Sequence, residues 1–217
     1  MKLQLYYAPD ACSMVPYINL AEAGARFDVI SVNMGKGEQK SPEYLKLNPK
    51  GKVPILVIDG EPLTENVAIN LWIAREFPQA KLLPADPMNE LKAISLMAWC
   101  AAGIHPALKP NNSPNCYCET PGSEDSVKQC AQKLLDDNFR IADDLLAGRE
   151  WFFDHFTAPD TYLFWTFIRA TRFDLKYLDL SKFRNCMAHL ERMKQRQSVQ
   201  TLLAFERQKQ EEFAKPG

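Results

Sequence analysis

The chain has 217 residues, of which 46% are hydrophobic and 24% are charged, and its formal net charge is -1. This balance is typical of a globular protein and excludes a disordered or fibrous chain. Because neither sign of charge dominates, we expect no nucleic acid and no anionic membrane surface as a partner.

The six cysteines and the apolar pattern together indicate the cellular compartment. The chain is too long for a small disulfide scaffold, its first residues show no apolar signal segment, and no apolar run approaches membrane-spanning length. We therefore expect a cytoplasmic protein with reduced thiols. Cys12 is the one cysteine in the first 78 residues, and the cysteines beyond them are Cys100, Cys116, Cys118, Cys130 and Cys186.

The first 78 residues predict alternating strands and helices. A strand, a helix and a second strand form a βαβ unit with a parallel pair. The turn Asp59-Gly60 then predicts an antiparallel hairpin, which a further helix follows. This order is that of a thioredoxin-like domain. The expected strands cover 2–7, 27–32, 54–58 and 62–64, and the expected helices cover 13–24, 42–47 and 67–77.

The stretch from Pro78 to Pro87 contains three prolines and no periodicity, and it predicts a linker over residues 79–87. Strand signals stop beyond it, so residues 88–217 predict an all-helical domain and the fold class is α/β plus all-α. Thr157 and Asp160 have the spacing of a capping box, which indicates a structural helix start. The expected helices cover 88–105, 126–147, 158–171, 181–194 and 199–211.

Several stretches, from near residue 3 to near residue 200, together resemble the bacterial beta-class, cysteine-type glutathione transferase family. The resemblance implies a glutathione-binding domain over 1–78, a helical domain over 88–217 that contributes the electrophile site, and a homodimer. The matching stretches are Tyr6 to Ser13, Asn48 to Pro54, Leu63 to Ile69, His105-Pro106 and Phe156 to Phe164.

Cys12 follows the first strand and lies at the expected start of a helix, where free N–H groups and the helix dipole favour negative charge. Such a place lowers the pKa of a thiol. The alternative is a small buried hydrophobic side chain. The resemblance implies that Cys12 lies at the sulfur of glutathione, and the hydroxyl group of Ser13 is a second candidate donor to a thiolate.

Four residues are expected to bind glutathione. The resemblance implies a cis Val53-Pro54 bond, which leaves the backbone of Val53 free to pair with the cysteinyl unit. Glu65 and Asn66 precede an expected helix, whose N-terminal amides can hold a carboxylate. Glu65 would take the γ-glutamyl ammonium and Asn66 its carboxylate. Simple helix capping by Asn66 is compatible with this role.

His105 is expected to close the first helix of the second domain, where the C-terminal dipole favours its protonated form. A surface histidine is the alternative. The resemblance places His105 beside the glutathione thiol as a catalytic residue. His155 and His189 belong to no recognisable cluster, so no metal site is expected.

Other residues depart from the family pattern or remain open. Tyr17, Asn66 and Gly103 differ from what the family often has at these places. Cys116 and Cys118 lie in a polar loop and make at most a weak metal or redox site. We expect an exposed loop there, with a role in shaping the electrophile entrance.

The expected function is transfer of glutathione, as the co-substrate, to small hydrophobic electrophiles. Two alternatives stay open. One is glutathione-dependent thiol–disulfide exchange through Cys12, and the other is a non-catalytic module that binds glutathione or another ligand.

Overall fold

The computed structural model describes residues 1–214 and divides into two compact units, each of which is described by itself. The first unit comprises Met1–Leu83 and the chain from Lys194 onward, and the second comprises Pro84–Met193.

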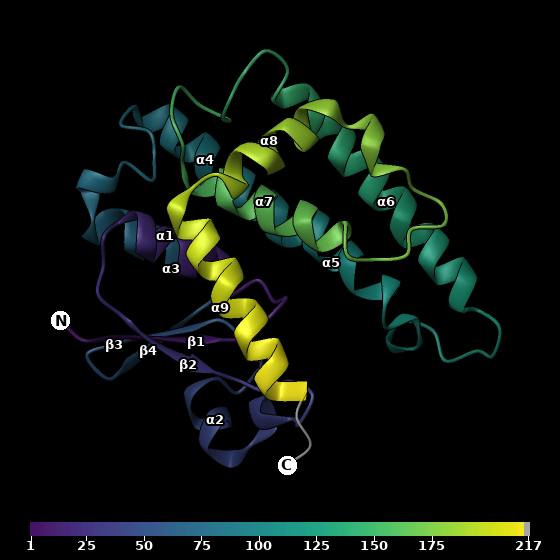
Figure 1. The fold of residues 1–217 in the computed structure, drawn as a ribbon, viewed down its shortest axis with the longest axis horizontal. Helices are drawn as coiled ribbons and strands as arrows, with labels where there is room; N and C mark the ends of the chain where they lie inside the picture. The colour runs from purple at the N-terminus through teal and green to yellow at the C-terminus, as the bar shows by residue number, and fades with distance from the viewer. Residues whose placement is uncertain (215–217) are drawn as a thin grey trace. The chain divides into compact units, whose positions relative to one another are not determined.

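The first unit is built on a mixed four-stranded sheet in the order β2-β1-β3-β4 (Figure 1). β1 pairs with β2 in parallel, whereas the β1–β3 and β3–β4 pairs are antiparallel. Leu5 and Leu56 face each other across the two central strands and are fully buried. Leu5 belongs to an alternating strand and Leu56 to a continuous apolar one. The βαβ and hairpin predictions are confirmed. The strands are β1 (Leu3–Tyr7), β2 (Asp28–Ser31), β3 (Ile55–Ile58) and β4 (Glu61–Thr64).

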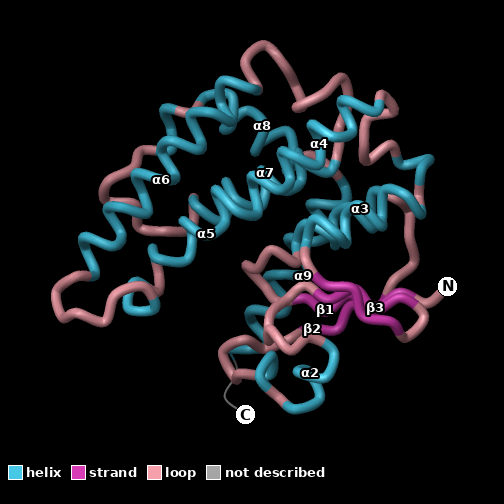
Figure 2. Tube along the Cα trace, turned by 180° about the vertical axis from the view of Figure 1, so that it is seen from behind, coloured by secondary structure: helices cyan, strands magenta, loops and turns pink. Residues whose placement is uncertain are grey.

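Helices cover both faces of this sheet. Figures 1 and 2 show α1 and α3 together on one face and α2 on the other. Ser41 caps α2 by accepting the N–H of Tyr44 at 3.2 Å, and Pro42 occupies its first turn. The helices of this unit are α1 (Met14–Glu22), η1 (Glu38–Lys40), α2 (Pro42–Leu47), α3 (Asn66–Glu76), η2 (Pro78–Ala80) and α9 (Gln197–Ala214).

Helix α9 corrects the expected domain boundary, because it belongs to the first unit and not to a helical domain over 88–217. The ring of Phe205 stacks on Tyr17 of α1 at a centroid distance of 6.0 Å. Arg196, just before α9, donates two hydrogen bonds to the carboxylate of Glu22 at 2.8 and 2.6 Å. An amphipathic pattern predicts a buried helix face but does not identify the element that covers it.

The second unit is helical, as expected. Helix α7 forms its centre, and all but one of its 13 residues are buried. The capping box of α7 is confirmed, since the N–H of Thr157 donates to Oδ2 of Asp160 at 2.8 Å. The elements are α4 (Pro87–Trp99), η3 (Cys100–Ile104), α5 (His105–Leu108), η4 (Lys109–Asn111), η5 (Pro114–Cys116), α6 (Glu124–Leu145), α7 (Ala158–Ala170), η6 (Leu180–Lys182) and α8 (Arg184–Lys194).

The expected end of the first helix at His105 is wrong. A π-helical segment, η3, follows α4, and the N–H of His105 donates to the carbonyl oxygen of Cys100, five residues earlier. Such a wide turn lets the helical course continue past Pro106, which has no N–H to donate. His105 is therefore not at a helix C-terminus, and the expected effect of the helix dipole on it does not apply.

The helical run from Pro87 to Asn111 corrects the expectation that no apolar stretch approaches membrane-spanning length. Its 25 residues are long and apolar enough to cross a membrane by length and composition, and 33% of its most apolar window is buried. Core helices of soluble proteins meet the same criterion. Helix α4 packs against α7, and its buried residues are Ala93 and Met97.

Candidate active site

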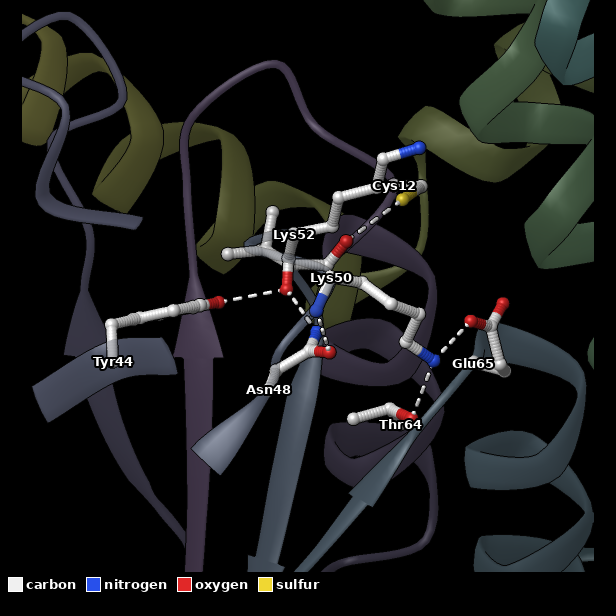
Figure 3. A network of polar contacts seen from close by, with 8 residues as sticks. Cys12, Tyr44, Asn48, Lys50, Lys52, Thr64 and Glu65 are labelled. Atoms are coloured by element: carbon white, nitrogen blue, oxygen red, sulfur yellow. Dashed lines mark hydrogen bonds and ion pairs between the residues drawn. The ribbon is translucent and has the colours of Figure 1, made fainter. Parts of the chain in front are cut away.

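Cys12 lies in the turn between β1 and α1, two residues before α1 begins. Its thiol donates a hydrogen bond of 3.6 Å to the carbonyl oxygen of Val53 (Figure 3). The carbonyl oxygen of Cys12 accepts the side-chain amide of Asn66 at 3.1 Å. These contacts join the turn, the segment before β3 and the first residue of α3 at one place in the first unit.

The lowered pKa expected for Cys12 is wrong. The side chain is 8% exposed, and its burial raises the pKa to about 12. A hydrogen bond from Asn66 and the charge of Lys52 act in the opposite direction but are outweighed. The free energy lost when a thiolate is removed from water exceeds the stabilisation by the neighbouring polar groups. The thiol therefore keeps its proton at neutral pH.

Ser13 follows Cys12 and is fully buried, and its hydroxyl group is hydrogen-bonded to Ala8. Its hydroxyl group donates to the carbonyl oxygen of Ala8 and accepts the N–H of Ala8, both at 3.1 Å. Its proton is therefore already used within the turn. Ser13 holds the shape of the turn that presents Cys12, and the expected donation from Ser13 to a thiolate does not fit this arrangement.

The Val53-Pro54 bond is cis, as the resemblance implied. The preceding segment is held by two residues that the sequence analysis missed as site residues. Tyr44 and Asn48 both donate to the carbonyl oxygen of Lys52, at 2.8 and 2.7 Å (Figure 3). The N–H of Val53 donates to no other part of the described chain, 1–214. The backbone of Val53 is thus fixed in place with its donor available.

The start of α3 differs from the expectation, because Glu65 and not Asn66 occupies the N-cap position. Glu65 is the residue before the helix, and its backbone has a left-handed φ of 72°. This conformation is strained for a residue with a side chain. Asn66 is the first helical residue, so the expectation that it caps α3 is wrong. Its amide nitrogen reaches Cys12, and its Oδ1 is buried without a hydrogen-bond partner among the described residues.

Lys50 is a further residue that the sequence analysis missed. Its Nζ lies 2.5 Å from Oε1 of Glu65 and 2.9 Å from Oγ1 of Thr64 (Figure 3). An ammonium group therefore already occupies the carboxylate that was expected to receive the ammonium of glutathione. Fourteen residues separate Lys50 from Thr64, and no local pattern indicates the pairing.

His105 belongs to the second unit and is described there by itself. Its ring contacts the ring of Trp165 edge-on, with centroids 4.4 Å apart. The packing around Gly103 explains why a glycine stands at this position. A Cβ on Gly103 would lie 2.9 Å from Cδ1 of Trp99, whose Nε1 donates to Asn138 at 2.7 Å. The remaining predicted residues, Cys12, Ser13, Val53, Pro54, Glu65 and Asn66, all belong to the first unit.

A cysteine in the turn after β1, a cis-proline before β3 and a helix start at Asn66 define a thioredoxin-like unit. The N-terminal domain of glutathione S-transferases matches residues 1–75. The chain is 32% identical to glutathione S-transferase GstA of Escherichia coli O157:H7 over 208 residues, which cover 94% of this chain and 98% of that one. It belongs to the glutathione S-transferase family, whose members are transferases.

Comparison with solved structures indicates which class of glutathione S-transferases the chain resembles. A bacterial beta-class glutathione S-transferase from Sphingomonas chungbukensis is 34% identical, with a TM-score of 0.81. A sphingomonad glutathione S-transferase complexed with glutathione is 29% identical, with the same TM-score. Each comparison covers 94% of this chain and 98% of the other. The similarity extends over both units, and the resemblance to bacterial beta-class enzymes is confirmed.

Proposed function

We propose that the protein conjugates reduced glutathione to small hydrophobic electrophiles, with glutathione bound in the first unit beside Cys12. The observation that carries the proposal is the meeting of the Cys12 thiol, the Val53 backbone and the first turn of α3. Glutathione carries a thiol, a cysteinyl peptide unit and a γ-glutamyl carboxylate. Each of these groups has a complementary partner in this arrangement.

The γ-glutamyl end would meet Glu65 and the start of α3. Its carboxylate would accept N–H groups of the first turn, and its ammonium would pair with Glu65. Because Lys50 now holds Glu65, binding would exchange one cation for another. The buried Oδ1 of Asn66 offers a further acceptor for a donor of the ligand.

Cys12 would act as a hydrogen-bond donor to the glutathione sulfur. Its pKa, raised by burial to about 12, keeps its S–H at neutral pH, and that hydrogen now points to Val53. Turned toward a bound thiolate, it would stabilise the negative sulfur and lower the pKa of glutathione. A protonated thiol is a poor nucleophile, which favours conjugation over disulfide exchange through Cys12.

His105 is proposed as a second catalytic donor in this reaction. The edge contact with Trp165 orients its ring. The assignment rests on the resemblance to the beta class, and it predicts that His105→Ala lowers kcat for conjugation more than it changes KM for glutathione.

The test is a titration of bound glutathione at 240 nm, where the thiolate absorbs. Wild type should show the band at neutral pH, and Cys12→Ala should raise the pKa of bound glutathione by about one unit, the size expected for one hydrogen bond to a charged atom. Cys130→Ala removes an exposed thiol on α6 and should leave the pKa unchanged. Absence of the band in wild type would overturn the proposal.

A matched pair of variants tests the γ-glutamyl site. Glu65→Gln removes the acceptor for the ammonium and should raise KM for glutathione about tenfold or more. Glu61→Gln, at an exposed position of strand β4, should leave KM unchanged. Equal KM values for both variants would place the γ-glutamyl group elsewhere.

The two alternatives have their own outcomes. If Cys12→Ala abolishes disulfide exchange and leaves conjugation intact, glutathione-dependent exchange through Cys12 is the function. Retention on immobilised glutathione without turnover of any conjugation or disulfide substrate would identify a ligand-binding module.

We also propose a homodimer formed through apolar side chains that the second unit leaves exposed. Leu134, Ile141 and Leu145 recur at helical spacing on α6 and are 55%, 51% and 44% exposed. Met88 and Leu91 of α4 are each 59% exposed. Sedimentation equilibrium should give a dimer mass, and Ile141→Lys should shift it toward the monomer.

All six cysteines are free, which suits the reducing cytoplasm, and we propose that location for the protein.

A further inference from the structure

The six thiols form two groups that differ in access to water. Cys12, Cys100 and Cys186 are 8%, 0% and 1% exposed, and burial raises the pKa of each. Cys116 and Cys130 are exposed and Cys118 is half-buried. A dissolved oxidant therefore reaches the second group first.

Cys116 is the last residue of η5, and Cys118 lies in the turn that follows it directly. The carbonyl oxygen of Pro114 accepts the N–H of Tyr117 at 2.9 Å and that of Cys118 at 3.3 Å. The hydroxyl group of Ser123 donates to the carbonyl oxygen of Cys118 at 3.4 Å. The turn is thus tied to the chain on both sides, and it holds two thiols separated by a single residue.

The surroundings of the two thiols distinguish Cys118. The hydroxyl group of Ser123 and the backbone and side chain of Thr120 can donate to a thiolate of Cys118 and lower its pKa, whereas burial and the carboxylate of Glu124 raise it. The one hydroxyl proton of Ser123 would turn from the carbonyl oxygen of Cys118 to its sulfur when the thiolate forms. The thiolate is the form that attacks a disulfide. Cys118 therefore combines access to solvent with donors that stabilise its reactive form.

We propose that Cys116 and Cys118 form a second, thiol–disulfide exchange site for small disulfides, with Cys118 as the attacking thiol and Cys116 as the resolving thiol. The thiolate of Cys118 attacks a disulfide RSSR, which forms a mixed disulfide and releases one thiolate. Cys116 then attacks the sulfur of Cys118, which forms the Cys116–Cys118 disulfide and releases a second thiol. RSSR is reduced to two RSH, and the protein loses two hydrogen atoms. This site does not depend on glutathione binding beside Cys12.

The charge around the turn selects among small disulfides. Glu119 follows Cys118 directly, and the Glu124 carboxylate acts on its thiol. Two acidic groups repel an anionic disulfide and attract a cationic one. Cystamine should therefore react faster than neutral hydroxyethyl disulfide, and glutathione disulfide should react slowest.

The experiment exposes the fully reduced full-length protein to cystamine at pH 7.5, followed by acid quench, intact mass and peptide mapping. Wild type should lose two hydrogen atoms without retaining an adduct. Cys116→Ser should retain one adduct on Cys118. Cys118→Ser should react about tenfold more slowly, because it lacks the thiol whose pKa is lowered and which is therefore the readier nucleophile. Cys130→Ser removes another exposed thiol and should behave as wild type.

The same measurements can overturn the proposal. A first adduct on Cys130 or Cys12, or a Cys118→Ser rate equal to that of wild type, would refute the attacking role of Cys118. Wild type that retains its adduct as long as Cys116→Ser would refute the resolving role of Cys116. Faster reaction with glutathione disulfide than with cystamine would refute the charge selection. Circular dichroism on each variant confirms that it is folded.

Discussion

The hydroxyl group of Tyr7, the last residue of β1, donates a hydrogen bond of 2.9 Å to Oε1 of Glu206 on α9. The N–H of Asp10 donates to the same oxygen at 2.7 Å. Glu206 is 2% exposed, and a buried carboxylate is tolerated only where hydrogen bonds compensate for lost water. The interaction ties α9 to the turn that leads to Cys12.

Replacing Glu206 by Ala should therefore lower the free energy of unfolding by about 3 kcal/mol, since the hydroxyl group of Tyr7 and the N–H of Asp10 both lose their buried acceptor. Urea denaturation measures the change. Glu211→Ala, an exposed position on the same helix, should stay within about 0.5 kcal/mol of wild type. Similar losses in both variants would mean that the buried network contributes nothing beyond helix α9 itself.

Gly51 and Gly37 allow a second matched comparison. Both have a left-handed φ, of 60° and 74°. A Cβ on Gly51 would lie 2.8 Å from Nζ of Lys40 and 3.0 Å from the carbonyl oxygen of Gln39, whereas one on Gly37 meets nothing within 4 Å. Gly37→Ala should cost about 1 kcal/mol from backbone strain alone. Gly51→Ala should cost about 1–2 kcal/mol more and weaken glutathione binding, because the segment before Val53 must shift. Equal unfolding curves for the two variants would contradict this.

Gly103→Ala should destabilise the second unit even though alanine is normally favoured in a helix by about 1 kcal/mol. The added methyl group would meet Trp99 at 2.9 Å and Oδ1 of Asn138 at 3.2 Å, so we expect a loss of about 2 kcal/mol. Denaturation followed by tryptophan fluorescence gives the value. Ala102→Ser, at the exposed neighbouring position, serves as the control. A stabilised Gly103→Ala variant would show that the pair of Trp99 and Asn138 yields without cost.

Cys12 should make stability fall at high pH. Burial raises its pKa from 9.0 to about 12, so above pH 9 the unfolded chain releases a proton that the folded chain retains. Stability from this group is unchanged below pH 9 and is lost as the pH rises toward 12. Between pH 7 and pH 10 wild type should lose about 1 kcal/mol more than Cys12→Ala in urea denaturation. Cys130→Ala should follow wild type, and a parallel decline in Cys12→Ala would argue against a buried, protonated Cys12.

Much of the candidate site could be predicted because it depends on local patterns. The alternation in β1, the apolar run of β3, the Asp59-Gly60 turn and the capping box at Thr157 each act over a few residues, and the structure confirms all of them. The motif around Val53 indicated its place before a strand. These features follow from backbone geometry and short-range hydrogen bonds, which neighbouring residues determine.

The tertiary structure decided what depends on distant partners. A helix start predicts a lowered pKa for Cys12, but the surrounding core removes its water and reverses the sign. Lys50 reaches Glu65, and Asn66 turns to Cys12, although no pattern in the sequence connects these pairs. The sequence by itself determined the elements, the order of the motifs and the residue types available for chemistry. Burial and charge at each site arise only when remote segments pack together, as α9 does where Glu206 meets Tyr7 across 199 residues.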